Sequence, residues 1–219
     1  ERRERAAPPL EIAPGRPVPL LIRPSPHPHS SGTYALDRDF SIGDFAVYVV
    51  VDPVYGGTPQ RRRLNVTRVD LDADRVEIND GRIVFDSMGN PLSIQGMAYD
   101  PRVQNVPVEV QIGRKWTTRF TRARAGDEPI SVYIDFRVSA RERIRIGAGE
   151  SEAFRIDGEG FDRRSGQRHV HATWIVPGLN FALQSESRRY DGRSLRVLEA
   201  EHRELVACRQ WRCDFADER

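Results

Sequence analysis

Two histidines, His169 and His171, have the spacing most suggestive of chemistry in this sequence. They flank one valine in a run that alternates in polarity, which is typical of a strand. Side chains two residues apart on a strand share a face, so both imidazoles could bind one metal ion. A further ligand is needed, and the candidates on other strands are His202, Glu159 and Glu201. The alternative places both histidines on the solvent face, with Val170 and Ala172 pointing into the core.

Two cysteines, Cys208 and Cys213, lie near the C-terminal end. Their spacing differs from the C-x2-C pairs of zinc ribbons, and the chain has no second pair to complete a four-ligand site. We predict a local disulfide formed in an oxidising compartment. The alternative is a pair of free thiols with a purely structural role.

Three arginines, Arg141, Arg143 and Arg145, alternate along one predicted strand and therefore share a face. That face could bind an anionic surface or an acidic partner. The alternative is a charged outer face that keeps sheet edges from aggregating. The net charge of the whole chain is only +2, with both signs interspersed, so no nucleic-acid partner is predicted.

The motifs of several large enzyme classes are missing from the sequence. It contains no G-x-S-x-G, no phosphate-binding P-loop and no dinucleotide-binding G-x-G-x-x-G. Neither cysteine has a histidine beside it. We therefore predict that the protein is not an enzyme and has no cofactor.

The elements that must position these residues are predicted to be strands. Runs of alternating polarity are separated by turn signals such as Asn79-Asp80-Gly81 and Arg164-Ser165-Gly166. No stretch has the convincing period of a helix. Large aromatic side chains on the apolar faces are the predicted core, namely Phe45, Tyr48, Trp116, Phe120, Phe136 and Phe154.

A weak internal repeat divides the strand-rich region. Gly43 and Gly113 each open an extended run, and Val66 and Val138 follow at similar distances. Such a repeat predicts two copies of one unit. We predict an all-β fold whose antiparallel meanders form two related curved sheets or open barrels. The predicted segments are a Pro-rich arm (1–33), two β sub-domains (34–107 and 108–207) and a tail with the cysteine pair (208–219).

The arm has a composition unlike the rest of the chain. Its many prolines exclude a central strand or a helix interior. Its apolar side chains predict docking on this domain or on a partner, through Leu10, Ile12, Leu20, Leu21 and Ile22. No apolar run approaches the ~20 residues of a membrane-spanning helix. The sequence starts at Glu1 and not at a methionine. Removal of a signal peptide and shortening of the chain would both explain this start.

Several short motifs in residues 108–207 occur in a recognisable order. Gly113 to Trp116 resembles a G-x-x-W opening, Trp174 to Pro177 a W-x-x-P strand end, and Glu204-Leu205-Val206 a closing E-L-V. Residues 148–156 resemble the hairpin between them, and residues 40–95 a domain often found before it. Together they resemble a family of uncharacterised exported proteobacterial domains, many of them lipoproteins. The resemblance implies an all-β fold and a cell-envelope location, and it supplies no catalytic residues.

These observations predict an exported protein of the periplasm or outer membrane that is an interaction or assembly subunit with a protein partner in the envelope. A lipid attached before Glu1 could anchor it. The arm and exposed strand edges would add to a partner's sheet. One alternative is a periplasmic binder of an apolar or anionic small ligand, or of a lipid, in a half-barrel cavity. The other is a metal-dependent hydrolase that uses His169 and His171.

Overall fold

The computed structural model describes residues 32–147, 149–210 and 213–215, whose regular elements are all strands. The first seven are β1 (Tyr34–Ala35), β2 (Phe45–Val51), β3 (Gln60–Asp70), β4 (Arg75–Ile78), β5 (Ile83–Phe85), β6 (Pro91–Ile94) and β7 (Met97–Asp100). The others are β8 (Glu109–Val110), β9 (Lys115–Arg124), β10 (Ile130–Ile146), β11 (Gly149–Asp162), β12 (Arg168–Ile175), β13 (Gln184–Tyr190), β14 (Val197–Gln210) and β15 (Cys213–Phe215). The predicted all-β antiparallel fold is confirmed.

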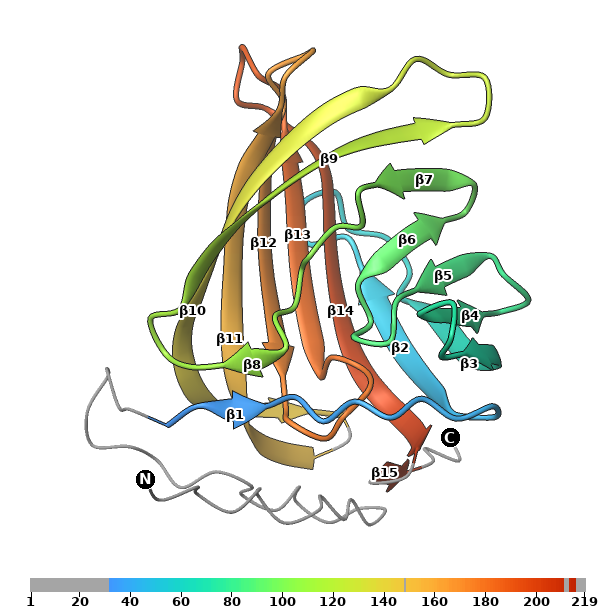
Figure 1. Ribbon diagram of the computed structural model, residues 1–219. Coiled ribbons are helices and arrows are strands. Elements are labelled where there is room, and N and C mark those ends of the chain that lie inside the picture. Colours follow the sequence, from blue (N-terminus) through green and yellow to red (C-terminus); the bar gives the residue numbers. More distant parts are fainter. Residues whose placement is uncertain (1–31, 148, 211–212, 216–219) are drawn as a thin grey trace.

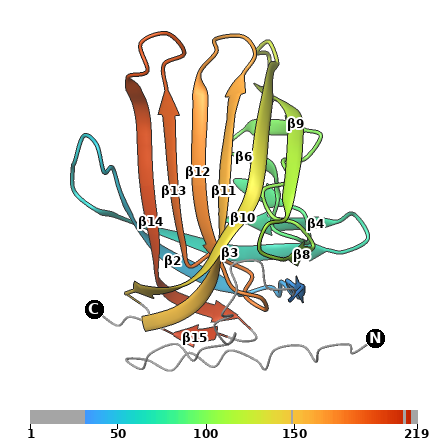
Figure 2. The same cartoon turned by 90° about the vertical axis from the view of Figure 1, so that its left-hand side faces the viewer.

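Nearly all these strands belong to one closed sheet. In the described part of the chain, thirteen strands pair in the order β13-β12-β11-β10-β9-β7-β6-β5-β4-β3-β2-β14-β15. β13 also pairs with β14, which closes all of them except β15 into a twelve-stranded barrel. The long strands β10 to β14 form one tall wall, and the short strands β3 to β7 lie on the opposite side (Figures 1 and 2). Strands from both predicted sub-domains therefore share one sheet, and β15 adds part of the predicted tail to it.

The internal repeat is visible in the backbone where each copy begins. Gly43 has a φ of 94° and Gly113 a φ of 90°. Residues with a Cβ atom rarely adopt this positive-φ backbone conformation, so glycine is favoured at both positions. The Gly43 amide donates to the Val66 carbonyl, and the Gly113 amide donates to the Val138 carbonyl. In each copy the ladder is shifted directly after this valine, as at a β-bulge. The repeat therefore encodes two equivalent hairpin openings within one barrel.

The core consists of two clusters of buried side chains, and one end of the barrel is capped. Phe45 and Tyr48 lie in the first cluster, whereas Phe120, Phe136 and Phe154 lie in the second. These five core predictions are confirmed, and Trp116 is partly buried with its ring stacked on Phe136 at 5.4 Å. β1 and β8 form a small separate sheet across the lower end (Figure 1). Four buried residues of this cap and its connector join the second cluster, namely Leu36, Val103, Val106 and Val110.

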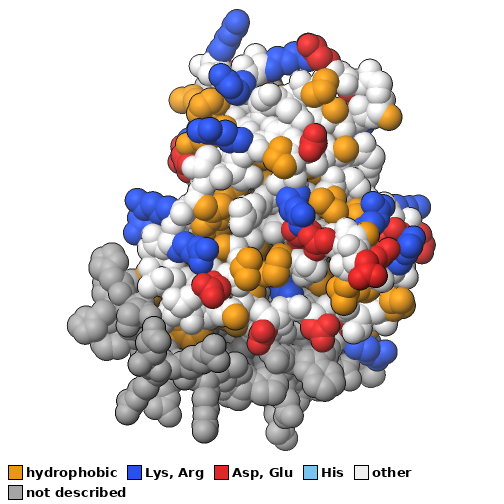
Figure 3. Space-filling view, viewed as in Figure 1, with side chains coloured by type: hydrophobic (Ala, Val, Ile, Leu, Met, Phe, Trp, Pro, Cys, Tyr) orange, Lys and Arg blue, Asp and Glu red, His pale blue; other side chains and the backbone are white. Residues whose placement is uncertain are grey.

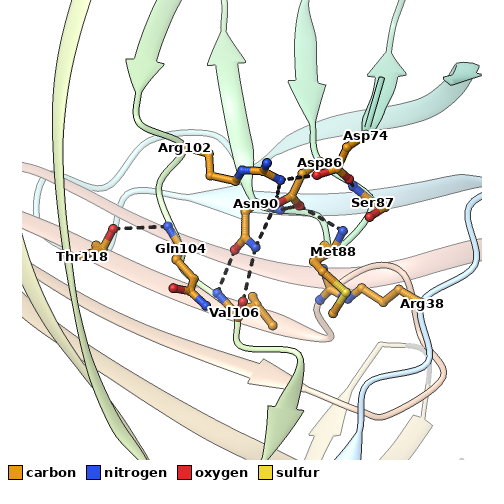
Figure 4. Close-up of polar contacts among 10 residues, drawn as sticks. All are labelled: Arg38, Asp74, Asp86, Ser87, Met88, Asn90, Arg102, Gln104, Val106 and Thr118. Carbon is orange, nitrogen blue, oxygen red and sulfur yellow. Dashed lines mark hydrogen bonds and ion pairs between the residues drawn. The ribbon is translucent and has the colours of Figure 1, made fainter. Parts of the chain in front are cut away.

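A buried carboxylate fastens the connector between β7 and β8 to the turn between β5 and β6 (Figure 4). Asp86 accepts hydrogen bonds from the backbone amides of Met88 (2.9 Å) and Asn90 (2.7 Å). Arg102 donates to the same carboxylate at 3.1 Å. The Asn90 side chain then exchanges two hydrogen bonds with the backbone of Val106. Because Asp86 and Asn90 are buried and most of their partners are backbone groups, this network holds the cap in place.

The outer surface mixes both signs of charge with small apolar patches (Figure 3). Large exposed apolar side chains are distributed over several turns, including Ile42, Leu71 and Leu195. No helix in the described ranges has the length and hydropathy of a membrane span.

Candidate functional site

A groove of about 910 Å³ lies over β9, β10 and β11, next to the end of β7. Residues from each of these strands and from the chain just after β7 and β11 line it, among them Pro101, Arg119, Tyr133, Asp135, Phe161 and Arg163. A smaller depression of about 530 Å³ adjoins it at Asp135. Because the lining strands are hydrogen-bonded neighbours, the groove has a rigid floor.

Three side chains form a row across the floor of the groove. Arg119 on β9 lies opposite Tyr133 on β10, and Tyr133 lies opposite Phe161 on β11. The Tyr133 and Phe161 rings are 5.7 Å apart, and the Arg119 guanidinium is also 5.7 Å from the centre of the Tyr133 ring. Phe161 is 49% exposed, which is unusual for so large an apolar side chain. The row offers a flat apolar surface with a cation at one end.

Asp135 supplies fixed polar groups beside this row. Its carboxylate accepts a hydrogen bond from Thr117 Oγ1 at 2.5 Å and another from the Tyr133 hydroxyl. The Thr117 and Tyr133 hydrogen bonds lower the pKa of Asp135, and the bond to Asp135 raises the pKa of Tyr133. At neutral pH the carboxylate is therefore charged and the phenol is protonated. The arrangement holds two hydroxyl donors on one carboxylate acceptor, which fixes the positions of polar groups beside the row.

The paired histidines lie on the inner face of the barrel. His169 is opposite Gly160 and His171 is opposite Gly158, and those glycines in turn face Ile134 and Phe136 of the core. His169 is only 7% exposed, and its ring lies parallel to the His171 ring at 6.4 Å. The alternative that both histidines face solvent is therefore wrong. Ala172, on the other face of β12, is buried in the first core cluster, as that alternative expected, so both faces of this strand are covered.

The further metal ligands considered for His169 and His171 do not converge on them. His202 is in register with Glu186 and, across β13, Ala172, so it lies on the outer face. Glu159 pairs with Val170 and also faces outward. Glu201 shares the histidine face, but β13 separates it from β12. Among the described residues, no group of three or more His, Cys, Asp or Glu side chains could hold a metal. Metal binding by the histidine pair stays a prediction.

The inner-face environment keeps both histidines neutral. Burial lowers the pKa of His169 to about 4, and the charges of Arg122 and His171 add to this effect. Burial also lowers the pKa of His171 to about 4, with Arg203 as the second cause. Both imidazoles are therefore uncharged at neutral pH and can each donate one hydrogen bond.

The three arginines of β10 share a face, as their spacing predicts, but acidic residues line it too. Arg141 and Arg145 contact Glu152 (3.5 Å) and Glu150 respectively, and Arg143 lies opposite Glu152 in register. The Arg141 side chain is only 5% exposed, whereas that of Arg145 is 83% exposed. Binding of an anionic surface through these residues stays a prediction.

Two other predicted sites lie wholly or partly outside the described residues. The arm contacts Leu10, Ile12, Leu20, Leu21 and Ile22 fall in residues 1–31, outside the described ranges. Cys208 is buried near the end of β14, and Cys213 begins β15, in register with Gln210. The strands thus bring the two backbones together, and the disulfide stays a prediction.

The groove is a site that sequence reasoning did not find. The alternation in β10 places Val132, Ile134 and Phe136 on the core face. The same alternation places Tyr133 on the other face, with Phe161 as a second aromatic on the polar side of its strand. Large aromatics on faces otherwise occupied by polar residues were the available signal.

Comparisons with known proteins add a fold-level likeness. No family model and no curated protein matches the chain. A structure from Bacteroides fragilis, described as an exported protein with a YmcC-like fold, covers 80% of this chain and 100% of its own, with 11% identity and a TM-score of 0.49. A lipoprotein from Parabacteroides distasonis covers 77% of this chain and 96% of its own, with 10% identity and a TM-score of 0.44. The lipoprotein YmcC from Escherichia coli covers 74% of this chain and 83% of its own, with 10% identity and a TM-score of 0.41.

Proposed function

We propose that the protein is a non-enzymatic, exported protein of the cell envelope that binds a small amphiphilic anion in the groove over β9, β10 and β11. The observation that carries this proposal is the row of Arg119, Tyr133 and Phe161. It corresponds to the small-ligand alternative raised by the sequence, with the ligand on the outer face of the barrel instead of within a half-barrel.

The chemistry of the row defines the ligand class. The groove volume of about 910 Å³ lies within the range typical of small-molecule sites. Covering the exposed Phe161 ring with an apolar or planar group lowers the free energy of the complex. A guanidinium at the Tyr133 end favours a negatively charged group there. A molecule with an apolar body and one anionic group satisfies both ends of the row.

Binding can be tested with 1-anilinonaphthalene-8-sulfonate, a planar apolar probe that carries one sulfonate. We expect saturable fluorescence enhancement with the folded wild-type protein. Phe161→Ala should raise the dissociation constant by about tenfold, because it removes more than 1 kcal/mol of ring contact. Arg119→Gln should raise it by a similar factor through loss of the anion contact. Tyr55→Ala is the matched control, since Tyr55 is another exposed aromatic, in a turn remote in sequence from the groove.

Two results would contradict the proposal. One is the absence of saturable binding by the folded protein. The other is an equal loss of affinity in Tyr55→Ala and Phe161→Ala, which would mean that the probe adsorbs to any exposed ring. Circular dichroism on each variant establishes that a loss of signal does not come from unfolding.

The assembly-subunit function is a second candidate, and one feature of the sheet favours it. Barrel closure leaves few free strand edges, but β7 covers only part of the edge of β9. The residues of β9 that pair with it are Thr121–Arg124. Residues 115–120 of β9 therefore have a strand neighbour on the β10 side alone, within the described chain. A partner strand could add at this edge, with the Pro-rich arm as a second contact. Deleting residues 1–31 should abolish association with the partner, and unchanged association would refute this function.

A further inference from the structure

His169 is buried at one end of the inner face without a hydrogen-bond partner for one ring nitrogen. It is 7% exposed, and its Nε2 atom contacts no donor or acceptor in the described part of the protein. Its register partner on β13 is Arg189, whose Nε is also buried and unpartnered among these residues. A buried polar atom without a partner is costly, and two on directly opposite residues are unusual.

The other contacts of Arg189 leave its Nε–H available. One terminal nitrogen lies 2.9 Å from Glu199, and the other donates to Gln167 at 3.4 Å. These bonds hold the guanidinium in place without using Nε. Directly opposite residues of an antiparallel pair have Cβ atoms about 5 Å apart. The two free nitrogens therefore belong to neighbouring side chains on one face.

Two arginines and two carboxylates lie around His169. Arg122 on β9 lies on the same face and is 4.0 Å from the carboxylate of Asp162 on β11. Arg122 and Arg189 both lower the pKa of His169, after burial, whereas Asp162 alone raises it. Glu199 on β14 lies 2.9 Å from Arg189, so two carboxylates balance the two guanidinium groups, and the two unpartnered nitrogens are the groups left to bind an anion. The partly exposed side chains of Arg122 and Arg189 also show that solvent reaches this end.

We propose that His169 and Arg189, with Arg122 beside them, bind a small oxyanion on the inner face of the barrel. A neutral imidazole N–H and a guanidinium N–H would each donate to one of its oxygen atoms, which satisfies both unpartnered nitrogens. The groove residues Arg119, Tyr133 and Phe161 lie on the opposite face of the sheet. The two sites are therefore independent, and either can fail without the other.

The test uses inorganic phosphate and the full chain. Titration should raise the thermal midpoint of the wild-type protein saturably and shift the ring proton signals of His169 in NMR spectra. Arg189→Gln and His169→Gln should each raise the phosphate dissociation constant by about tenfold or more, as expected for a lost charge-assisted hydrogen bond. Arg188→Gln and His202→Gln are the matched controls, because these neighbours face outward on β13 and β14.

The pH dependence gives a second readout. The groups around His169 are Arg122 on β9, Asp162 on β11, His171 on β12 and Arg189 on β13, with Glu199 on β14 paired to Arg189. A bound anion favours the imidazolium, so phosphate should raise the pKa of His169, and the ring shifts should titrate at higher pH in its presence. Glycerol 3-phosphate, run in parallel, identifies the source: tighter binding than phosphate indicates a head group, and weaker binding a free ion.

Three outcomes would overturn the proposal. The first is that neither phosphate nor glycerol 3-phosphate shifts the His169 signals of the wild-type protein. The second is that Arg188→Gln weakens binding as much as Arg189→Gln, which would indicate general charge attraction. The third is wild-type affinity in a folded His169→Gln or Arg189→Gln variant. Because the NMR experiment uses the wild-type protein, it decides the matter even if a variant does not fold.

Discussion

Gly158 and Gly160 allow a sharp test of how the barrel wall is packed, because they differ in what a methyl group would meet. Both lie on β11 and face inward, opposite Phe136 and Ile134. A Cβ atom at position 160 would overlap the carbonyl oxygen of Tyr133 and lie 2.6 Å from Ile134 Cα. A Cβ atom at position 158 would instead overlap the edge of the Phe136 ring. The first obstacle is backbone and the second is a side chain.

The difference sets the expected loss of stability. In Gly158→Ala the Phe136 ring can shift, so we expect a loss of about 1–3 kcal/mol in the free energy of unfolding, as in other overpacked cores. Replacing glycine by alanine in a strand offsets about 0.5–1 kcal/mol of this loss. In Gly160→Ala the β10 backbone cannot move without stretching ladder hydrogen bonds, each worth about 0.5–1.5 kcal/mol. We expect a loss of about 4 kcal/mol or more there, in the range that only a few mechanisms produce.

Urea unfolding followed by tryptophan fluorescence measures both losses. Gly158→Ala is the matched control, because it adds the same methyl group to the same face of the same strand. The reasoning fails if Gly160→Ala is as stable as Gly158→Ala or more stable. Such a result would mean that β10 and β11 separate easily at this point.

Three further outcomes follow from buried groups. Stability should fall as pH drops from about 6.5 to about 4, because the unfolded chain binds protons on His169 and His171 while the folded protein keeps their pKa near 4; His169→Gln should make this slope in pH-dependent unfolding shallower, and an unchanged slope would contradict the assignment. Mass spectrometry of the unreduced protein should show Cys208 and Cys213 linked, with reduction lowering stability by about 2 kcal/mol for so short a loop, and free thiols would refute the predicted disulfide. Asp86→Ala should cost about 3–5 kcal/mol in denaturant unfolding, since it leaves a buried network without its acceptor, and a loss below about 1 kcal/mol would show that the network is dispensable.

The sequence was sufficient where the information is local. Large aromatic residues on apolar faces identified Phe120 and Phe136 as core, and the glycines at 43 and 113 marked two equivalent hairpin openings. Barrel closure was not predictable in this way. It depends on β14 pairing with both β2 and β13, and no residue type in these strands specifies a partner so distant along the chain.

The candidate sites show the same limit at the level of single side chains. In β12, alternation of histidine with valine and alanine fits either orientation, since both sets suit a half-buried strand. The structure buries residues of both sets, since His169 and Ala172 are each 7% exposed, and a strand covered on both faces cannot be recognised from alternation. The groove row likewise combines residues from three strands whose register the sequence does not give.

The pairing of β2 with β14 has a consequence for how the chain reaches its fold. Phe45 begins the first strand of the ring and lies opposite Arg209, near the end of the last long strand. A chain that emerges from its N-terminal end must hold β2 with one edge unpaired until almost all of the sequence has followed. Contacts so remote along the chain are slow to form, and unpaired edges attract other strands meanwhile. We therefore expect chains that lack β14 to aggregate, and the complete chain to fold slowly and late, in a single closing step.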